Sequence, residues 1–447
     1  MSSASPANAI NLSEYMDETP WTWPQKLVVG LAALAFMLDG CANQILGVAM
    51  PAIIAEWNVP RAAIAPVAAI GLFGIAIGAI TGGMLADRLG RRRCLIFAFL
   101  LFGTMTLLAA TTNGVVSLAI VRFFDGLGLG AAIPSGAALL TETSPRRRRA
   151  IAIALGMAFI PAGGFLAGML GGLILPDYGW RALFVIVGLL SLGVGALFVL
   201  ALPESPSFLV LKEGRGAELH RVMCRFKGRL DPEMRFFDVR PSRGEQRFAA
   251  LLAPGLRTET LAVWIGFFCC LLATYTMFSW LPTMLSERGF AIDQSSFIMG
   301  AFNGGATFGG LVSGFVFQRF GVRTPLMTIT AIAAIAAVVL SVAPLDPHHH
   351  LPLLFAFMFL GLLLAGMHNG FYTLPALVYP AALRATGIGA AAAFGRLGAI
   401  LSSFTGVLSM NLSGSMAYFL LIALALVVAI WSVHSVRVTA GAAVSAH

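Results

Sequence analysis

Residues 83–92 read "GMLADRLGRR", and a related stretch, "GFVFQRFGVR", returns at residues 314–323 in the second half of the chain. Pro51 and Pro282, each at the end of a long apolar segment, are separated by the same number of residues as the two stretches. The sequence therefore consists of two related halves. A parallel repeat of this kind is typical of transporters, in which the substrate sits between halves that rock around it.

The composition indicates a surface that faces something apolar. Of the 447 residues, 58% are hydrophobic and only 11% are charged, and the mean hydropathy is +0.87. A typical soluble protein has about a quarter of its residues charged, so these values favour a polytopic membrane protein. The net charge of +9 could suggest nucleic acid, but the basic residues lie in short loops between apolar segments. No nucleic-acid partner is therefore expected.

The apolar segments have the length of membrane-spanning helices. A hydrocarbon core of about 30 Å needs about 20 apolar residues in a helix. On this scale we expect an all-α fold with twelve transmembrane helices in two bundles of six. The predicted helices cover residues 27–51, 64–86, 94–112, 115–140, 150–174, 182–201, 259–281, 293–317, 325–343, 351–378, 386–409 and 416–434.

These helices divide the chain into five parts. The predicted parts are an N-terminal leader (1–26), an N-terminal six-helix bundle (27–201), a central loop (202–258), a C-terminal six-helix bundle (259–434) and a tail (435–447).

The positions of lysine and arginine predict the orientation. Most of the 29 basic residues fall on the side of the leader and the central loop, and only Arg61, Arg181 and Arg288 fall on the opposite side. Short loops rich in lysine and arginine stay in the cytoplasm. We therefore expect a multi-pass protein of the inner (plasma) membrane with both termini in the cytoplasm. A monomer is expected.

Nothing in the sequence predicts a metal centre, a bound cofactor or catalysis. The five cysteines have no ligand spacing, and "PHHHL" (347–351) has no acidic or cysteine partner. "GLGLG" (126–130) lies inside a predicted membrane helix without a preceding strand, so it is not a dinucleotide motif. Because no nucleophile–base pair is found either, the chain is not expected to be an enzyme.

Three motifs resemble the major facilitator superfamily. "GGMLADRLGRR" (82–92) fits the signature between the second and third spans. "RFFDGLGLGAAIP" (122–134) fits the fourth span, and "LPESPSFL" (202–209) fits the end of the sixth. The resemblance covers essentially the whole chain and implies the major facilitator fold.

Narrower matches are similar to the aromatic acid–proton symporter family. The first span of that family carries Asp-Gly-x-Asp, and this chain has Asp39 and Gly40, with Ala42 at the position of the second acid. "WLPTML" (280–285) and "YPAALRATGIGAAAAFGRLGAI" (379–400) also match, and the latter is the most specific to the family.

The resemblance implies import of a small aromatic carboxylate, such as a hydroxylated benzoate, by proton symport with alternating access. The proton gradient would be the driving force, with no cofactor. Other organic anions, such as a dicarboxylate or a nicotinate-like acid, and an efflux carrier are open alternatives. A carrier-derived membrane sensor is a further alternative, but the central loop is too short and too charged to supply an obvious signalling domain.

Asp39 is the first candidate for proton coupling, because it lies near the middle of the first predicted span. An ionised side chain at that depth costs at least about 2.5–3.5 kcal/mol, so it should face a cavity or a partner. Arg122 and Asp125 in the fourth span are predicted to share the coupling. Asp39 could instead make a structural contact between helices. Arg122 and Asp125 could simply neutralise each other; otherwise Arg122 could face Asp39 across the cavity.

Arg396 is expected to hold the substrate carboxylate, because a planar guanidinium matches a carboxylate in two parallel bonds. A structural bond to backbone carbonyls is the alternative. Asn43, one helical turn after Asp39, could hydrogen-bond either the Asp39 carboxylate or a ligand. The other predicted substrate contacts are aromatic or imidazole side chains, each of which could instead be a packing residue: Tyr275, Trp280, His368 and Tyr372.

Charged residues at the predicted cytoplasmic edge are candidates for an inner gate. Charge pairs there could latch the protein in its outward-open state, although a solvated basic loop is the alternative. The predicted gate residues are Asp87, Arg88, Arg92, Glu142 and Arg384.

Overall fold

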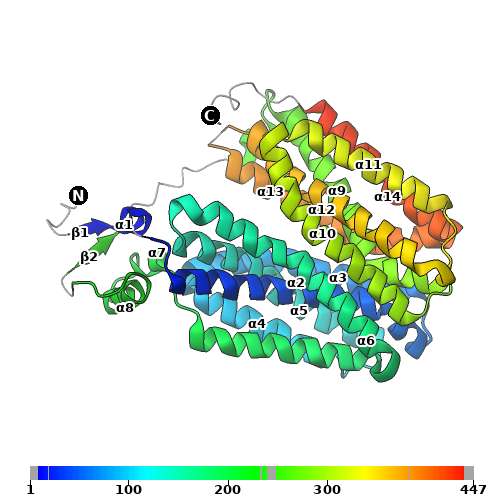
Figure 1. The fold of residues 1–447 in the computed structure, drawn as a ribbon, viewed down its shortest axis with the longest axis horizontal. Helices are drawn as coiled ribbons and strands as arrows, with labels where there is room; N and C mark the ends of the chain where they lie inside the picture. Colours follow the sequence, from blue (N-terminus) through cyan, green and yellow to red (C-terminus); the bar gives the residue numbers. More distant parts are fainter. Residues whose placement is uncertain (1–8, 19, 232–233, 239–247, 381, 437–447) are drawn as a thin grey trace.

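The computed structural model describes residues 9–18, 20–231, 234–238, 248–380 and 382–436. Long helices dominate it, and Figure 1 shows them in two bundles, one built from α2 to α6 and the other from α9 to α14. The expected all-α fold is confirmed.

The N-terminal bundle contains five helices by backbone continuity. They are α2 (Trp23–Trp57), α3 (Arg61–Leu89), α4 (Arg91–Ala109), α5 (Val115–Thr143) and α6 (Arg146–Ala201). α6 is in fact two helices, because the backbone turns at Gly179, where φ is +72°. Glycine adopts this left-handed conformation without strain. The predicted spans 150–174 and 182–201 lie on either side of this turn.

The C-terminal bundle contains six helices. They are α9 (Arg257–Glu287), α10 (Ile292–Phe320), α11 (Arg323–Val342), α12 (His350–Val378), α13 (Arg384–Ser413) and α14 (Ser415–Ser435). Two short 3-10 segments, Phe248–Leu252 and Pro347–His349, precede α9 and α12.

The number of spans agrees with the prediction. In the described part of the chain, ten helices are long and apolar enough to cross a membrane. One of these is α6, which supplies two spans. α10 has the length of a span but is less apolar, since it carries Asp293, Gln294, Asn303 and Gln318. With α10 and both parts of α6, the two bundles contain the twelve predicted helices.

A small unit lies at one end of the molecule (Figure 1). It consists of β1 (Ala9–Asn11), α1 (Leu12–Glu18), α7 (Pro206–Leu209), α8 (Gly216–Lys227) and β2 (Arg235–Phe237). β1 pairs with β2 in parallel, and the rings of Tyr15 and Phe236 lie 5.6 Å apart. Lys227 Nζ donates to the Pro20 carbonyl at 3.1 Å. The leader is therefore attached to the central loop. We call this end the α8 end and the opposite end, where α2 stops at Trp57, the Trp57 end.

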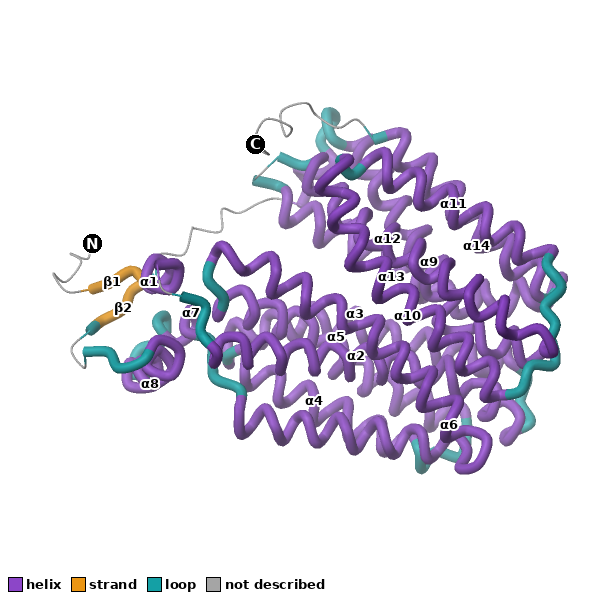
Figure 2. Tube along the Cα trace, in the orientation of Figure 1, coloured by secondary structure: helices purple, strands orange, loops and turns teal. Residues whose placement is uncertain are grey.

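The two bundles converge toward the Trp57 end and separate toward the α8 end (Figure 2). Glycines permit the close approach, since small residues let helix backbones touch. A Cβ atom on Gly168 would lie 2.4 Å from the Gly300 nitrogen, and one on Gly47 would lie 2.2 Å from the Phe278 carbonyl oxygen. In both cases the contact joins a helix of one bundle to a helix of the other.

Polar contacts reinforce this junction. Gln44 on α2 and Asn303 on α10 exchange two side-chain hydrogen bonds, of 2.9 and 2.7 Å, and both residues are buried. At the Trp57 end itself, Arg61 at the start of α3 forms an ion pair with Glu287 at the end of α9.

Candidate functional site

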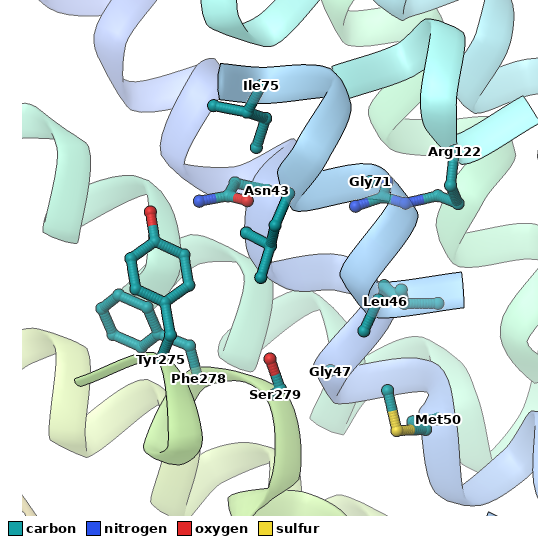
Figure 3. Close-up of a pocket in the computed structure, with 12 residues that line it drawn as sticks. Asn43, Leu46, Gly47, Met50, Gly71, Ile75, Arg122, Tyr275, Phe278 and Ser279 are labelled. Atoms are coloured by element: carbon teal, nitrogen blue, oxygen red, sulfur yellow. The ribbon is translucent and has the colours of Figure 1, made fainter. Parts of the chain in front are cut away.

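A cavity lies between α2, α3, α5 and α9, where the two bundles meet (Figure 3). It is narrow in this conformation, with a cavity volume of about 30 Å³, well below the ~300–1,000 Å³ typical of small-molecule pockets. Its wall is mostly aliphatic, with two rings and a few polar groups. The aromatic and polar lining residues are Asn43, Arg122, Tyr275, Phe278 and Ser279.

Asp39 lies on the face of α2 that leads into this cavity. Gly40, the next residue on the helix, packs so tightly on α6 that a Cβ would lie 2.0 Å from the Ile160 carbonyl oxygen. Asp39 shares a helical face with Asn43 and Leu46, which line the cavity, because residues four and seven apart lie on the same side of a helix. Its side chain is therefore inside the protein rather than against lipid, and the residue is only 4% exposed.

The Asp39 carboxylate has few direct polar contacts among the described residues. Its Oδ1 atom is buried without a hydrogen-bond partner among the described residues. Arg396 and Asp125 are near enough to interact with it electrostatically. A buried carboxylate in this position is costly unless a cation, a proton or a ligand compensates it. Asp39 is therefore a buried acid without a direct hydrogen bond on Oδ1 among the described residues, with Arg396 as a nearby cation.

Arg122 is paired with Asp125, one turn later on α5. Arg122 Nη1 lies 2.5 Å from Asp125 Oδ2, and Thr106 Oγ1 donates to the other carboxylate oxygen at 3.0 Å. Both members of the pair are buried. Of the two arrangements considered for Arg122, the structure contains this ion pair. The guanidinium still borders the cavity, and its Nε atom has no hydrogen-bond partner among the described residues.

Arg396 on α13 has no such acidic partner within ion-pair distance in the described part of the chain. Its Nη1 atom donates to the Tyr275 hydroxyl at 3.1 Å. The remaining guanidinium donors are then available to an anion. His368 and Tyr372 on α12 also lie within electrostatic range of this arginine. Arg396 is thus the centre of a cationic and aromatic cluster.

Aromatic side chains continue this cluster in both directions. The Tyr275 and Phe278 rings lie 5.5 Å apart, and the His368 and Tyr372 rings lie 5.2 Å apart. The His368 Nε2 atom is buried without a hydrogen-bond partner in the described residues. Tyr372 is 40% exposed although its ring meets the Phe267 ring edge to face, with the ring centroids 4.9 Å apart.

Trp280 is the one predicted substrate contact that lies away from the cluster. It is fully buried and packs on Gly406, where a Cβ would lie 2.4 Å from the Trp280 Cδ1 atom. It does not line the cavity between α2 and α9. In this structure Trp280 occupies a packing position.

The five predicted gate residues have different surroundings. Asp87 and Glu142 are joined by a third residue, Arg91, which lies 2.8 and 2.9 Å from their carboxylates. Arg88 and Arg384 are exposed, and Arg384 begins α13 in the other bundle. Arg92 donates its backbone N–H to Glu204 at 3.1 Å.

Arg91, Ser205 and Glu204 were missed in the sequence. Ser205 donates its hydroxyl to Glu142, so the network extends from α5 to the start of the central loop. Three consecutive arginines look alike in a sequence. Only Arg91 is buried, because it begins α4 and turns back over the end of α3.

Comparison with known proteins agrees with this fold. The Major Facilitator Superfamily model matches residues 32–403 and 263–444. A gallate transporter of Pseudomonas putida is 31% identical over 92% of both chains. The 4-hydroxybenzoate transporter PcaK of the same species is 30% identical over 90% of both chains. The inward-open structure of the xylose transporter XylE from E. coli has a TM-score of 0.71 at 20% identity and covers 93% of this chain and 97% of that one.

The resemblance found in the sequence motifs is thereby confirmed. The family consists of transporters, so the expectation that the chain is not an enzyme is also confirmed. With its many apolar helices, the chain is a multi-pass membrane protein. It belongs to the Major Facilitator Superfamily and, within it, to the aromatic acid transporters.

Proposed function

We propose that this chain imports a small aromatic carboxylate of the hydroxybenzoate kind together with a proton. The proposal is supported by relatives that are named as transporters of gallate and of 4-hydroxybenzoate. The observation that carries it is the cluster around Arg396: a cation with free donors, beside the Tyr275 hydroxyl and within electrostatic range of Asp39. A carboxylate attached to an aromatic ring matches both the cation and the rings.

Charge neutralisation would couple the two cargoes. The substrate carboxylate binds Arg396, which then no longer compensates Asp39, and Asp39 takes up a proton. With both charges cancelled, the bundles can close around the site at a lower desolvation cost. Release of the substrate to the other side returns Arg396 to Asp39 and favours release of the proton. Arg122 and Asp125 would keep their own charges balanced during this cycle.

The α8 end is proposed to face the cytoplasm of a cell bounded by its inner membrane, in keeping with the lysine and arginine bias. The gate would close there. Arg384 on the C-terminal bundle would then approach the acids around Arg91, with Arg88 and Arg92 beside them. A monomer would suffice, since both halves of the site lie in one chain. The proton gradient would drive the cycle, and neither a cofactor nor nucleic acid would take part.

Uptake into vesicles tests this function. Purified protein in liposomes is given labelled 4-hydroxybenzoate with and without an imposed pH gradient, with succinate and nicotinate as competing anions. We expect accumulation that depends on the gradient and resists both competitors. Asp39→Asn should lose accumulation and keep exchange of internal for external substrate. Accumulation that ignores the gradient would refute the coupling, and full accumulation by Asp39→Asn would remove Asp39 from it.

A further inference from the structure

Two polar side chains in the cavity wall lack the partners that similar groups have elsewhere in the molecule. Hydroxyls in these helices generally donate to a carbonyl about one turn earlier, as Ser135, Ser191 and Thr276 do at 2.7 to 2.8 Å. Ser279 makes no hydrogen bond to any described residue, and neither does Asn43. Both border the cavity, and neither is fully buried.

The missing hydrogen bonds of Ser279 and Asn43 matter because most of the cavity wall around them is aliphatic. Leu46, Met50, Leu72 and Ile75 line the same space. A polar group held in an apolar wall without a partner costs free energy unless a ligand or water satisfies it. Figure 3 shows the Ser279 hydroxyl and the Asn43 amide projecting into the space beside the Tyr275 and Phe278 rings.

Tyr275 connects this wall to the cation. Its hydroxyl accepts from Arg396, and its ring borders the cavity together with Phe278. A ring acid whose carboxylate binds Arg396 would therefore lie along these two rings. The far edge of the substrate ring would then face Asn43 on α2 and Ser279 on α9.

We propose that Asn43 and Ser279 recognise hydroxyl groups on the substrate ring and so select hydroxylated aromatic acids over unsubstituted ones. The Asn43 carbonyl oxygen accepts from a phenolic O–H, and Ser279 Oγ can donate to the phenolic oxygen or accept from it. This assignment rests on the proposed function. It adds that the substrate contacts both bundles through its hydroxyl groups as well as through its carboxylate.

The selectivity follows from the cost of an unmatched polar group. A site that hydrogen-bonds a substrate hydroxyl discriminates strongly against an analogue without it, because the groups of the site are left unpaired. Removing those groups should have the opposite effect. The hydroxylated acid then loses its hydrogen-bond partners, whereas the unsubstituted acid contacts a more apolar wall with no unpaired polar group.

Ser279→Ala and Asn43→Leu test the assignment by initial uptake rates of benzoate, 4-hydroxybenzoate and 3,4-dihydroxybenzoate in vesicles. Loss of a hydrogen bond of this kind predicts KM values for the two hydroxylated acids about tenfold higher, with kcat little changed and KM for benzoate unchanged or lower. Ser432→Ala is the control, because Ser432 is a buried hydroxyl without a hydrogen-bond partner among the described residues and lies on α14, away from the cavity. It should alter none of these values.

Thermal stabilisation of the purified variants by each acid gives a second readout for a variant that transports poorly. Stabilisation by the hydroxylated acids should fall while stabilisation by benzoate persists. An equal change for all three acids, or no change, would overturn the assignment and leave the proposed function intact. If the unaltered protein neither transports nor is stabilised by any of the acids, the proposed function fails and the assignment fails with it.

Discussion

The Trp57 end and the α8 end of the molecule use their polar side chains in different ways. Toward the Trp57 end, polar groups join the two bundles: Gln44 bonds Asn303, and Arg61 pairs with Glu287. At the α8 end, the network around Arg91 connects helices of the N-terminal bundle and the start of the central loop. In the described ranges, no ion pair joins the bundles there.

This difference indicates which contacts stabilise one conformation of the whole protein and which stabilise the fold of a single bundle. Contacts between bundles must break when the Trp57 end opens, so they set the balance between conformations. Contacts within a bundle persist in every conformation, so they set the stability of that bundle. Mutations at the two ends should therefore change different observables.

Arg91→Met should have the largest effect on stability. Arg91 is nearly buried and pairs with Glu142 and with the partly exposed Asp87. Removing one partner of a buried ion pair typically costs about 3–5 kcal/mol, and solvent screening at Asp87 reduces its share of that cost. We expect a clearly lower melting temperature in detergent, with and without substrate. Arg93→Met, the exposed arginine two positions later, is the matched control and should melt like the unaltered protein. Equal melting of the two variants would show that the network does not stabilise the bundle.

Gly168→Ala should shift the conformational balance, because the new methyl group would meet the backbone of Gly300 in the other bundle. Overpacking of this kind costs about 1–3 kcal/mol, and opening the Trp57 end relieves it. The expected result is faster labelling of Met50→Cys, in the cavity wall, by a thiol reagent supplied from the Trp57 side. All variants in this experiment also have the five native cysteines replaced, so that only the cysteine introduced at position 50 is labelled.

Gly193→Ala is the control for this experiment, since a Cβ at Gly193 meets nothing within 4 Å. It should label at the original rate. Slow labelling in both variants would mean that the Gly168–Gly300 contact does not hold the Trp57 end closed.

Gln44→Leu and Asn303→Leu should each weaken the same junction more mildly, by about 1–3 kcal/mol, because each leaves a buried amide without its partner. Replacing both removes both unpaired groups, so the double variant should be closer to the unaltered protein than the sum of the single variants predicts. The rate of Met50→Cys labelling is again the measurement. Strict additivity would mean that the two amides act independently.

The smallest effect is a pH dependence confined to the attached leader. Partial burial lowers the pKa of Lys227 to about 8, with Asp17 opposing the shift. When the leader is detached, Lys227 has the pKa of an exposed lysine. Between pH 8 and that value, the protein with a detached leader therefore binds more protons than the protein with an attached one. Attachment therefore becomes tighter as the pH rises through this window. Proteolysis of the leader should slow accordingly, and Lys227→Met should remove the dependence. A slope that survives in Lys227→Met would assign it to another group.

The fold was predictable because its signals are local. Twenty-residue apolar segments, the repeated "GMLADRLGRR" loop and the basic loops can each be recognised without knowing what lies next to them. Even the division of α6 falls in the polar gap between two predicted spans, at Gly179. Among the site residues, Asp39 and Arg396 stood out because a charge in the middle of an apolar segment is rare.

The rest depends on which way a side chain points and on distant parts of the chain. Arg91 cannot be told from its neighbours until the end of α3 is in place. Trp280 resembles Tyr275 in the sequence, but the two residues lie on different faces of α9. Gln44 and Asn303 are separated by 259 positions, and nothing in either local sequence marks them as a pair. The attachment of the leader to the central loop was missed for the same reason.

The most direct test is a pair of distance measurements on the same protein. Spin labels at Arg88→Cys and Arg384→Cys report on the α8 end, and labels at Arg61→Cys and Glu287→Cys report on the Trp57 end, each measured with and without 4-hydroxybenzoate at low and high pH. If the bundles rock around the Arg396 cluster, conditions that shorten the first distance must lengthen the second. Two distances that stay fixed, or that change in the same direction, would contradict the account.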